Sequence, residues 1–528
     1  MNFAKLGIAA ILALGAGRVA GGQEAPPPCC ATGATAAVQQ APAEAMASER
    51  FTLRVQSLLK RAPVDKGEWG LLVVDAATGA TLYQNNADSY FVPASNMKLL
   101  TTALALDKLG TEFRFRTTVE TDGRVSSRGR LTGNLILVGR GDPNLSNRRF
   151  PFEKKEEFDG GPEKVIAELA DKIVARGVKE IYGDVVGDDS YFPRERYPDG
   201  WEIDDMVWEY GAAISALVVD DNTVALTLTP GTRVGSAVTG IVEPATPDFT
   251  VKNEVVTSAA REKAELRLTR EPGANVVVVT GTMPAGGASR KLVLAIQEPA
   301  QHAAAMLARL LAQRGVKIRG KIRALHEPDP AETKRTVLAE HLSVPLGESV
   351  KLVNKISQNL HAEVLLRTAA RQQGVWATPE DLPKFPLEFY ARAGTAPEDV
   401  VQTDGSGLSR HDLVTPRAFV ALLQYAAKQP WFPAYFASLP VAGEDGTLSE
   451  RLKGSGIAGR IHAKTGSVTH VRGLSGYADT PGGRRLIFSL MTNNQQGKNH
   501  DLHDAMDEAC RAMIEEFDMP AAVEAKPQ

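Results

Sequence analysis

The chain has 528 residues, of which 43% are hydrophobic and 23% are charged, which is typical of a globular protein with more than one domain. Its formal net charge at pH 7 is −3. Binding to nucleic acid needs a concentrated basic face, so this charge gives no reason to expect a nucleic-acid partner.

The N-terminus has the pattern of a secretory signal. Lys5 is followed by an apolar stretch over 6–16 and by small residues over 20–22. We therefore expect a signal peptide over 1–22, export to the periplasm or cell envelope, and no transmembrane anchor in the mature chain, because the apolar stretch is too short to span a bilayer. A buried helix is the alternative. Residues 23–49, rich in Ala and Pro, are predicted to be a flexible linker.

Folding is predicted to begin near residue 50, with a helix over about 51–59. Two runs over 70–75 and 81–84, separated by a turn, predict a β-hairpin. The most apolar helical pattern of the chain follows Ser95 and ends at Gly110, so this helix should be buried nearly all round.

The middle of the chain is predicted to be an insertion over 126–334. It contains a strand pattern over 133–139, a helix over about 163–176, and a Thr/Val-rich β-like region over about 223–296, which we interpret as a nested domain. The similar segments 175–179 and 313–317 each join a helix to a strand. They predict two helix-strand units of one α/β layer.

The C-terminal part is strongly helical over 346–371, and residues 460–468 and 485–491 alternate as two paired strands would. A last helix is expected over 499–517, followed by a tail over 519–528. We therefore predict an α/β (α+β) protein whose catalytic domain consists of 50–125 and 335–518, split by the insertion.

A nucleophile and a base are suggested by Ser95-Asn96-Met97-Lys98. If Ser95 begins a helix, Lys98 lies one turn later on the same face, where burial would let it accept the serine proton. Ser57-Leu58-Leu59-Lys60 also matches, but it lies on an amphipathic helix with no motif of its own to follow. The pattern alone is therefore a weak signal.

Two further motifs follow in order. Ser357-Gln358-Asn359 places a hydroxyl that could relay a proton and an amide that could position Lys98 or hold a carbonyl group. Lys464-Thr465-Gly466 lies in a strand pattern, where Lys464 and Thr465 suit a terminal carboxylate and Gly466 lets a ligand lie against the backbone. Neither motif is specific when it stands alone.

Other site types have little support in the sequence. Residues 454–459 match a dinucleotide-binding pattern, but they precede a strand instead of following one. The His and Cys residues do not have the spacing of a metal site. We therefore expect no cofactor and no metal.

The ordered motifs resemble the active site of penicillin-recognising serine enzymes. The gap between the first two motifs makes the chain similar to the penicillin-binding protein 4 type of D-alanyl-D-alanine carboxypeptidase/endopeptidase, the class C low-molecular-mass penicillin-binding proteins or peptidase family S13. The resemblance extends over about 50–518 and includes the segments 141–143, 187–192, 200–205, 215–217 and 404–410. It implies a transpeptidase-like core of antiparallel sheet flanked by helices.

This resemblance implies roles for the motif residues. Ser95 would attack the penultimate D-Ala carbonyl, Lys98 would be the base, and the N–H groups of Ser95 and Ser467 would form the oxyanion hole. Ser357 and Asn359 would line one side, while Lys464, Thr465 and Gly466 would face the substrate carboxylate. Water would then hydrolyse the acyl-enzyme.

The family also recognises the free end of a peptidoglycan side chain through an acid of the insertion and a later Arg. Asp205 and Arg410 fit these positions, with Tyr210 as an aromatic wall and Asp204 as a neighbouring alternative. The free end of that side chain carries both an amine and a carboxylate, so a site that binds it needs one anion and one cation.

The predicted function is a serine-type D-Ala-D-Ala carboxypeptidase, DD-endopeptidase or both, which acts on peptidoglycan stem peptides and is inhibited by β-lactams. The alternatives are a β-lactamase or esterase with the same active-site plan, and a non-catalytic peptidoglycan-binding protein. The sequence leaves open the balance of the two peptidase activities, the oligomeric state, the role of the insertion, and the fate of Cys29 and Cys30.

Overall fold

The computed structural model describes residues 32–153, 156–158, 160–245, 249–328, 334–454 and 456–519. The predicted signal peptide, 1–22, and all but one residue of the predicted tail lie outside these ranges. Residues 47–528 form one compact unit, and residues 1–46 are a second unit. No helix within the described ranges is long and apolar enough to cross a membrane.

The first helix, α1 (Thr32–Leu59), differs from the linker expected over 23–49, because residues from Thr32 onward are helical. Ala, Gln and Glu are good helix formers, so a segment that lacks large apolar residues can still be helical. Whether any of this segment acts as a tether stays a prediction. The expected helix over 51–59 is confirmed as the end of α1, where Phe51, Val55 and Leu58 are buried.

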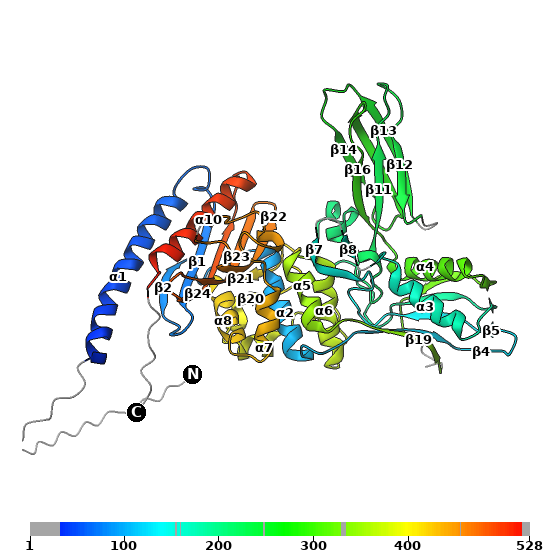
Figure 1. The fold of residues 1–528 in the computed structure, drawn as a ribbon, viewed down its shortest axis with the longest axis horizontal. Coiled ribbons are helices and arrows are strands. Elements are labelled where there is room, and N and C mark those ends of the chain that lie inside the picture. The colour runs from blue at the N-terminus through cyan, green and yellow to red at the C-terminus, as the bar shows by residue number, and fades with distance from the viewer. Residues whose placement is uncertain are drawn as a thin grey trace, which may run out of the picture. The chain divides into compact units, whose positions relative to one another are not determined.

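A five-stranded antiparallel sheet, in the order β2-β1-β24-β23-β22, joins the two ends of the chain. Alternate residues of β1 contribute to two cores, because successive side chains of a strand point to opposite faces. Leu71 and Val73 pack with α1 and α10, whereas Leu72 and Val74 pack with α2 and α8 (Figure 1). The strands are β1 (Glu68–Asp75), β2 (Thr81–Asn85), β22 (Ile461–Val468), β23 (Val471–Asp479) and β24 (Arg485–Asn493).

The expected pairing of 460–468 with 485–491 is wrong in one respect. β22 and β24 each pair with β23, which lies between them, and not with each other. The sequence of β23 is rich in Gly, Ser and Ala, which are poor strand formers, so its pattern is hidden. β23 is nevertheless a strand, because its side chains are buried on both faces of the sheet.

Helices surround this sheet. They are α2 (Met97–Leu109), α5 (Leu346–Lys355), α6 (Asn359–Gln372), α7 (Leu387–Arg392), α8 (Pro416–Ala426), α9 (Phe432–Ser438) and α10 (Asn499–Glu516), and two short strands, β20 (Val400–Val401) and β21 (Leu413–Val414), pair beside them. The buried α2 ending at Gly110 and the last helix are confirmed. The helical region expected over 346–371 is confirmed as two helices, because the backbone at Ser357 has φ +63 and separates α5 from α6. A residue with that conformation cannot continue a right-handed helix.

The inserted region is built on a second five-stranded sheet, in the order β18-β10-β6-β3-β19. Two of its strands, β3 and β19, lie outside the expected limits of the insertion, 126 and 334. The strands are β3 (Arg116–Thr121), β6 (Leu135–Val138), β10 (Val185–Asp188), β18 (Ile322–Leu325) and β19 (Thr336–Leu342). Helices α3 (Lys164–Ala175) and α4 (Pro299–Gln313) share an apolar core with it.

The two similar helix-strand segments are neighbours in space. Each leads from its helix through a glycine, Gly177 or Gly315, into a short strand, and the strands β9 (Glu180–Ile181) and β17 (Lys317–Ile318) pair in parallel. The two units predicted from sequence are thus confirmed. The same small sheet contains β4 (Arg124–Val125) and β5 (Arg130–Thr132).

Residues 223–295 form two three-stranded sheets around one apolar core (Figure 1). One sheet has the order β12-β11-β16 and the other β13-β15-β14. The strands are β11 (Thr223–Thr229), β12 (Thr239–Glu243), β13 (Thr250–Ser258), β14 (Glu265–Thr269), β15 (Val276–Pro284) and β16 (Arg290–Ala295). A hairpin is formed by β7 (Arg148–Glu153) and β8 (Glu156–Phe158), which pair antiparallel.

A buried ion pair joins the end of β1 to the turn before β24 in the first sheet. Arg484 Nε lies 2.6 Å from Asp75 Oδ2, and the two side chains are 4% and 2% exposed. Burial acts to raise the pKa of Asp75, but hydrogen bonds from Thr78 and Arg484 outweigh it and hold this pKa below its ordinary value.

We expect Arg484→Met to lower the free energy of unfolding by about 3–5 kcal/mol at pH 7, because it leaves a buried carboxylate without its cation. Urea denaturation measures the effect. The difference in unfolding free energy from wild type should shrink as the pH falls below the ordinary pKa of Asp75. The pKa of Asp75 is depressed in the folded state, so its ionised form stabilises the fold fully only above the pKa of the unfolded state. Arg116→Met, which removes an exposed pair with Glu340, is the control and should cost less than about 1 kcal/mol. Equal losses in the two variants would contradict the prediction.

Candidate active site

Ser95 lies in a tight turn that leads directly into α2. The turn is a short 3₁₀ helix, Ala94–Asn96, which starts with Ala94 in a left-handed conformation (φ +47). Asn96 donates a side-chain hydrogen bond to Ser475 Oγ of β23 at 2.8 Å. The Ser95 hydroxyl is therefore held at the start of a helix that is buried through Leu106.

Lys98 is the predicted partner of Ser95, and the structure brings the two together. Its Nζ donates to Ser95 Oγ at 2.9 Å, to Asn359 Oδ1 at 2.6 Å and to the Ser406 carbonyl at 2.7 Å. The side chain is fully buried. Burial lowers the pKa of Lys98 to about 7, although the carboxylates of Asp404, Glu363 and Asp412 act in the opposite direction. A neutral amine able to accept a proton is thus accessible near neutral pH.

The second motif lies at the break between α5 and α6. Its Ser357 is the left-handed residue at this break, and its hydroxyl accepts a hydrogen bond from Lys464 Nζ at 2.9 Å. Asn359 begins α6; its carbonyl oxygen accepts from Lys98, and its amide nitrogen donates to the Tyr210 carbonyl at 2.8 Å. The break that the sequence did not reveal is what turns both side chains toward the first motif.

The third motif lies on the edge strand β22. Lys464 is fully buried and donates to Ser357 Oγ and to the Thr465 carbonyl, both at 2.9 Å. Burial and the nearby charge of Lys98 lower the pKa of Lys464 well below its ordinary value. A Cβ atom at Gly466 would lie 2.6 Å from the Pro93 carbonyl, so glycine is what lets the strand approach the Ser95 turn.

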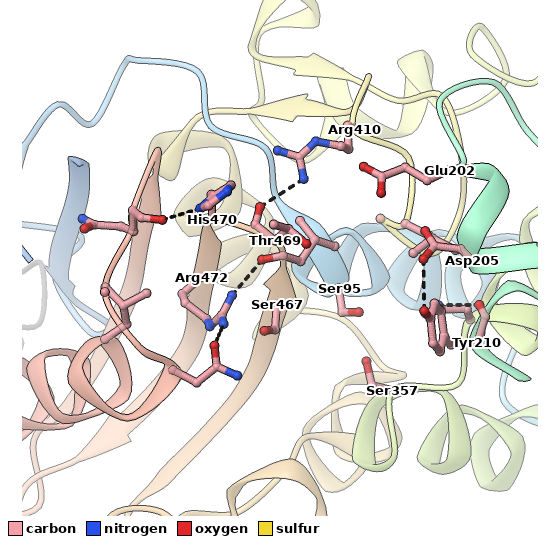
Figure 2. Close-up of a pocket in the computed structure, with 18 of the residues that line it drawn as sticks. Ser95, Glu202, Asp205, Tyr210, Ser357, Arg410, Ser467, Thr469, His470 and Arg472 are labelled. Atoms are coloured by element: carbon pink, nitrogen blue, oxygen red, sulfur yellow. Dashed lines mark hydrogen bonds between the residues drawn. The ribbon is translucent and has the colours of Figure 1, made fainter. Parts of the chain in front are cut away.

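A cavity of about 810 Å³ opens over the motifs. Ser95, Ser357, Asn359 and Ser467 all line it, and Figure 2 shows the three serines facing the same space. Lys98 and Lys464 lie buried behind this surface. Thr465 and Gly466 are not lining residues, and the Thr465 hydroxyl instead bonds with that of Thr447 at 2.7 Å.

Asp205, Tyr210 and Arg410 form one wall of the same cavity. The Tyr210 hydroxyl donates to Asp205 Oδ1 at 3.0 Å, and Arg410 Nη1 donates to the Thr469 carbonyl at 3.0 Å. Burial raises the pKa of Asp205. The neighbour Asp204 does not line the cavity, so the structure favours Asp205 of the two acids considered. An anion and a cation therefore face the cavity together (Figure 2).

Several residues of the site were not found by the sequence analysis. Glu202, Thr469, His470 and Arg472 also line the cavity. Thr469 and His470 lie in the turn between β22 and β23, Arg472 lies in the hidden strand β23, and Glu202 lies in the segment 200–205 without having been assigned a role. Glu363, which lies behind Lys98, could have been noticed, because it follows Asn359 by four residues and so lies on the same face of α6.

The loop 404–410 is a further part of the site, and apart from Arg410 its residues had no predicted chemical role. The Ser406 carbonyl accepts from Lys98, and Asp404 and Glu363 lie behind it as buried acids. Burial raises the pKa of Glu363 to about 7. Within the described ranges, no group of three or more His, Cys, Asp or Glu residues is placed to hold a metal ion.

The arrangement can perform acyl transfer. Ser95 Oγ lies within hydrogen-bonding distance of the buried Lys98 amine. Ser357 Oγ lies within the same distance of the buried Lys464 amine. The edge strand β22 runs past both, and Ser467, one residue before its end, lines the cavity. The structure thus brings together the residues expected to be nucleophile, base and proton relay, and their roles stay predictions.

Comparison with known proteins identifies relatives over most of the chain. Residues 52–513 match the model of the "D-Ala-D-Ala carboxypeptidase 3 (S13) family". The D-alanyl-D-alanine carboxypeptidase of Actinomadura sp. is 34% identical over 461 residues, which cover 84% of this chain and 81% of the relative. D-alanyl-D-alanine carboxypeptidase DacB of Haemophilus influenzae is 28% identical over 459 residues, covering 84% and 88%.

Solved structures agree with these sequence matches. The crystal structure of penicillin binding protein 4 (dacB) from H. influenzae matches with a TM-score of 0.77 and 25% identity, over 88% of this chain and 99% of that chain. The same protein complexed with a β-lactam matches with a TM-score of 0.72 and the same coverage. The resemblance and the fold class predicted from the three motifs are confirmed.

We expect the reaction of Ser95 with a serine-directed sulfonyl fluoride to accelerate as the pH rises through about 7 and to level off above it. The reason is that Lys98 must lose its proton before it can take the one on Ser95 Oγ. Mass spectrometry of the adduct gives the rate at each pH. Lys98→Met should react at least about a hundredfold more slowly, without the inflection. An unchanged inflection in that variant would show that another group is the base.

Proposed function

This chain belongs to the D-Ala-D-Ala carboxypeptidase 3 (S13) family, and on that premise we propose that Ser95 forms the acyl-enzyme of a serine-type carboxypeptidase. The observation that carries this assignment is the 2.9 Å contact between Ser95 Oγ and the Nζ of the fully buried Lys98. The decoy Ser57 is exposed on α1 and has no such partner, since no hydrogen bond joins it to Lys60 among the described residues.

In the acylation step, neutral Lys98 takes the proton of Ser95 Oγ, and the oxygen attacks the carbonyl carbon of the penultimate D-Ala. The N–H groups of Ser95 and Ser467 would stabilise the oxyanion of the tetrahedral intermediate. The bond to the terminal D-Ala nitrogen then breaks as this nitrogen receives the proton of Ser357 Oγ, which in turn takes the proton that Lys98 acquired, so that Lys98 is neutral again. Ser357 can donate, because its oxygen already accepts from Lys464.

In the deacylation step, water loses a proton to Lys98 and attacks the ester carbonyl carbon. The bond between that carbon and Ser95 Oγ breaks, and Ser95 regains the proton. Asn359 holds Lys98 in reach of both reactions through the hydrogen bond to Oδ1. The products are free D-Ala and a stem peptide shortened by one residue, or two separated peptides when the bond is a cross-link.

Substrate binding involves two charged regions of the site. On β22, Thr465 would bind the C-terminal carboxylate by giving up its bond with Thr447, with Lys464 buried behind it and Gly466 letting the strand lie close to the Ser95 turn. At the wall of the cavity, Asp205 would bind the amine and Arg410 the carboxylate at the free end of the peptidoglycan side chain, beside Tyr210.

Two further proposals concern partners and location. A relative has been crystallised with a β-lactam, which supports β-lactams as inhibitors that acylate Ser95 in this chain. Export to the periplasm or envelope is supported by the N-terminal pattern over 1–22 and by the substrate class of the family.

We expect a fluorescent penicillin to label the wild-type protein and to leave Ser95→Ala unlabelled on a denaturing gel. Ser57→Ala, which removes the decoy serine, should be labelled like the wild type. A wild type that takes no label would overturn the assignment. Rapid turnover of a chromogenic cephalosporin without a lasting adduct would instead favour the β-lactamase alternative.

We expect Arg410→Ala to lower kcat/KM roughly 10- to 100-fold for muropeptides with a zwitterionic side-chain end, because a charge-assisted hydrogen bond is lost. Mass spectrometry of defined muropeptides before and after treatment measures this and separates D-Ala release from cross-link cleavage. Acylation by a small penicillin, which lacks that end, should change little. A uniform loss with both reagents would contradict a role in substrate recognition.

A further inference from the structure

The inserted segment 199–211 touches the supports of the catalytic lysine as well as the wall of the cavity. Trp201 Nε1 donates to Asp404 Oδ2 at 2.8 Å, and Ser409 Oγ donates to the Asp199 carbonyl at 2.7 Å. A Cβ atom at Gly200 would lie 2.6 Å from Ser409 Oγ. The segment and the loop 404–410 are thus in direct, buried contact.

Asp404 is the centre of this contact. Its carboxylate accepts hydrogen bonds from the indole of Trp201, from the backbone N–H groups of Ser406, Gly407 and Ser409, and from the Ser406 hydroxyl, at 2.6–3.1 Å. It is 1% exposed. Four of these donors belong to the loop itself, so the carboxylate fixes the loop's conformation, and Trp201 is the donor that comes from the inserted region.

The loop held in this way is adjacent to both Ser95 and Lys98. The Ser406 carbonyl is one of the three acceptors of Lys98 Nζ. Gly407 has φ +78, and a Cβ atom there would lie 1.8 Å from the carbonyl of Ala94, the residue before the nucleophile. A shift of the loop would therefore move an acceptor of the base and loosen the turn that holds the serine.

We propose that Trp201 and Asp404 are a positioning pair through which the inserted region sets the geometry of Lys98, so that the insertion contributes to acylation itself and not only to substrate recognition. Neither side chain touches the reacting atoms. Trp201 holds the Asp404 carboxylate by a hydrogen bond, and this carboxylate holds the backbone of the loop. The loop in turn places the Ser406 carbonyl against the Lys98 amine. The inference rests on the proposed function of Ser95 and Lys98.

The charged groups that face Lys98 give this proposal a second readout. They are Glu363 of α6, which is paired with Arg367, Asp404 and Asp412 of the loop region, and Lys464 of β22. A carbonyl acceptor stabilises the ammonium form. If the Ser406 carbonyl moves away, Lys98 should lose its proton at lower pH, and the rising limb of the pH–rate profile should move to lower pH.

The test compares Trp201→Phe with wild type in acylation by a small penicillin, which lacks the zwitterionic side-chain end that the wall formed by Asp205 and Arg410 would bind. Phe keeps an aromatic ring in the apolar cluster but removes the indole donor. We expect the second-order acylation rate constant to fall roughly tenfold, as expected for the loss of one hydrogen bond to a charged group. The rising limb should move to lower pH. Trp208→Phe is the matched control, since no hydrogen bond joins its indole to the loop among the described residues, and it should acylate like the wild type.

Ser409→Ala removes the second hydrogen bond between the segment and the loop, and it keeps the proposal testable if Trp201→Phe fails to fold. It should cause a smaller loss of acylation rate in the same direction. Thermal melting shows which variants are folded.

Each outcome decides the proposal. Folded Trp201→Phe and Ser409→Ala proteins that acylate with the rate and pH profile of wild type would overturn it. Slower hydrolysis of muropeptides with unchanged penicillin acylation would also overturn it, because Trp201 would then only shape the wall. A wild type that penicillin does not acylate would instead refute the assignment of Ser95, on which the inference depends.

Discussion

The removal of Lys98 from water is the constraint on which the active site depends. A lysine can act as a base near neutral pH only when burial disfavours its ammonium form, yet a buried amine still needs hydrogen-bond partners. Here the partners are Ser95, Asn359 and the Ser406 carbonyl, which come from segments far apart in the chain. The fold must bring these segments together to within hydrogen-bonding distance, and much of the architecture follows from that requirement.

Close approach is achieved by backbone positions that tolerate little change. Gly407 and Gly466 both press against the turn that contains Ser95, and a side chain at either would collide with backbone carbonyls. Ala94 and Ser357 adopt left-handed conformations that residues other than glycine seldom adopt. Such conformations are held in place by surrounding contacts, and they are concentrated at functional sites.

The sequence predicted the chemistry better than the connections. The three motifs, the buried helix after Ser95 and the family followed from residue types and their order. The strand β23 was missed because its Gly- and Ser-rich sequence conceals a strand that burial stabilises. The break at Ser357 was missed because it depends on one backbone angle, and the contact between Trp201 and Asp404 because the two residues are distant in the chain. These three features depend on contacts between distant parts of the chain, so they cannot be predicted from a local sequence pattern.

The inserted region leaves and re-enters the catalytic core at adjacent points. β3 and β19 are paired antiparallel neighbours, and the Ser343 amide donates to the Phe115 carbonyl at 3.0 Å where the two crossings meet. A segment whose ends lie side by side can be gained or lost in one genetic event without displacing the remainder of the chain. The span of the core therefore sets no limit on the length of the segment between β3 and β19, because both of its ends start from one point.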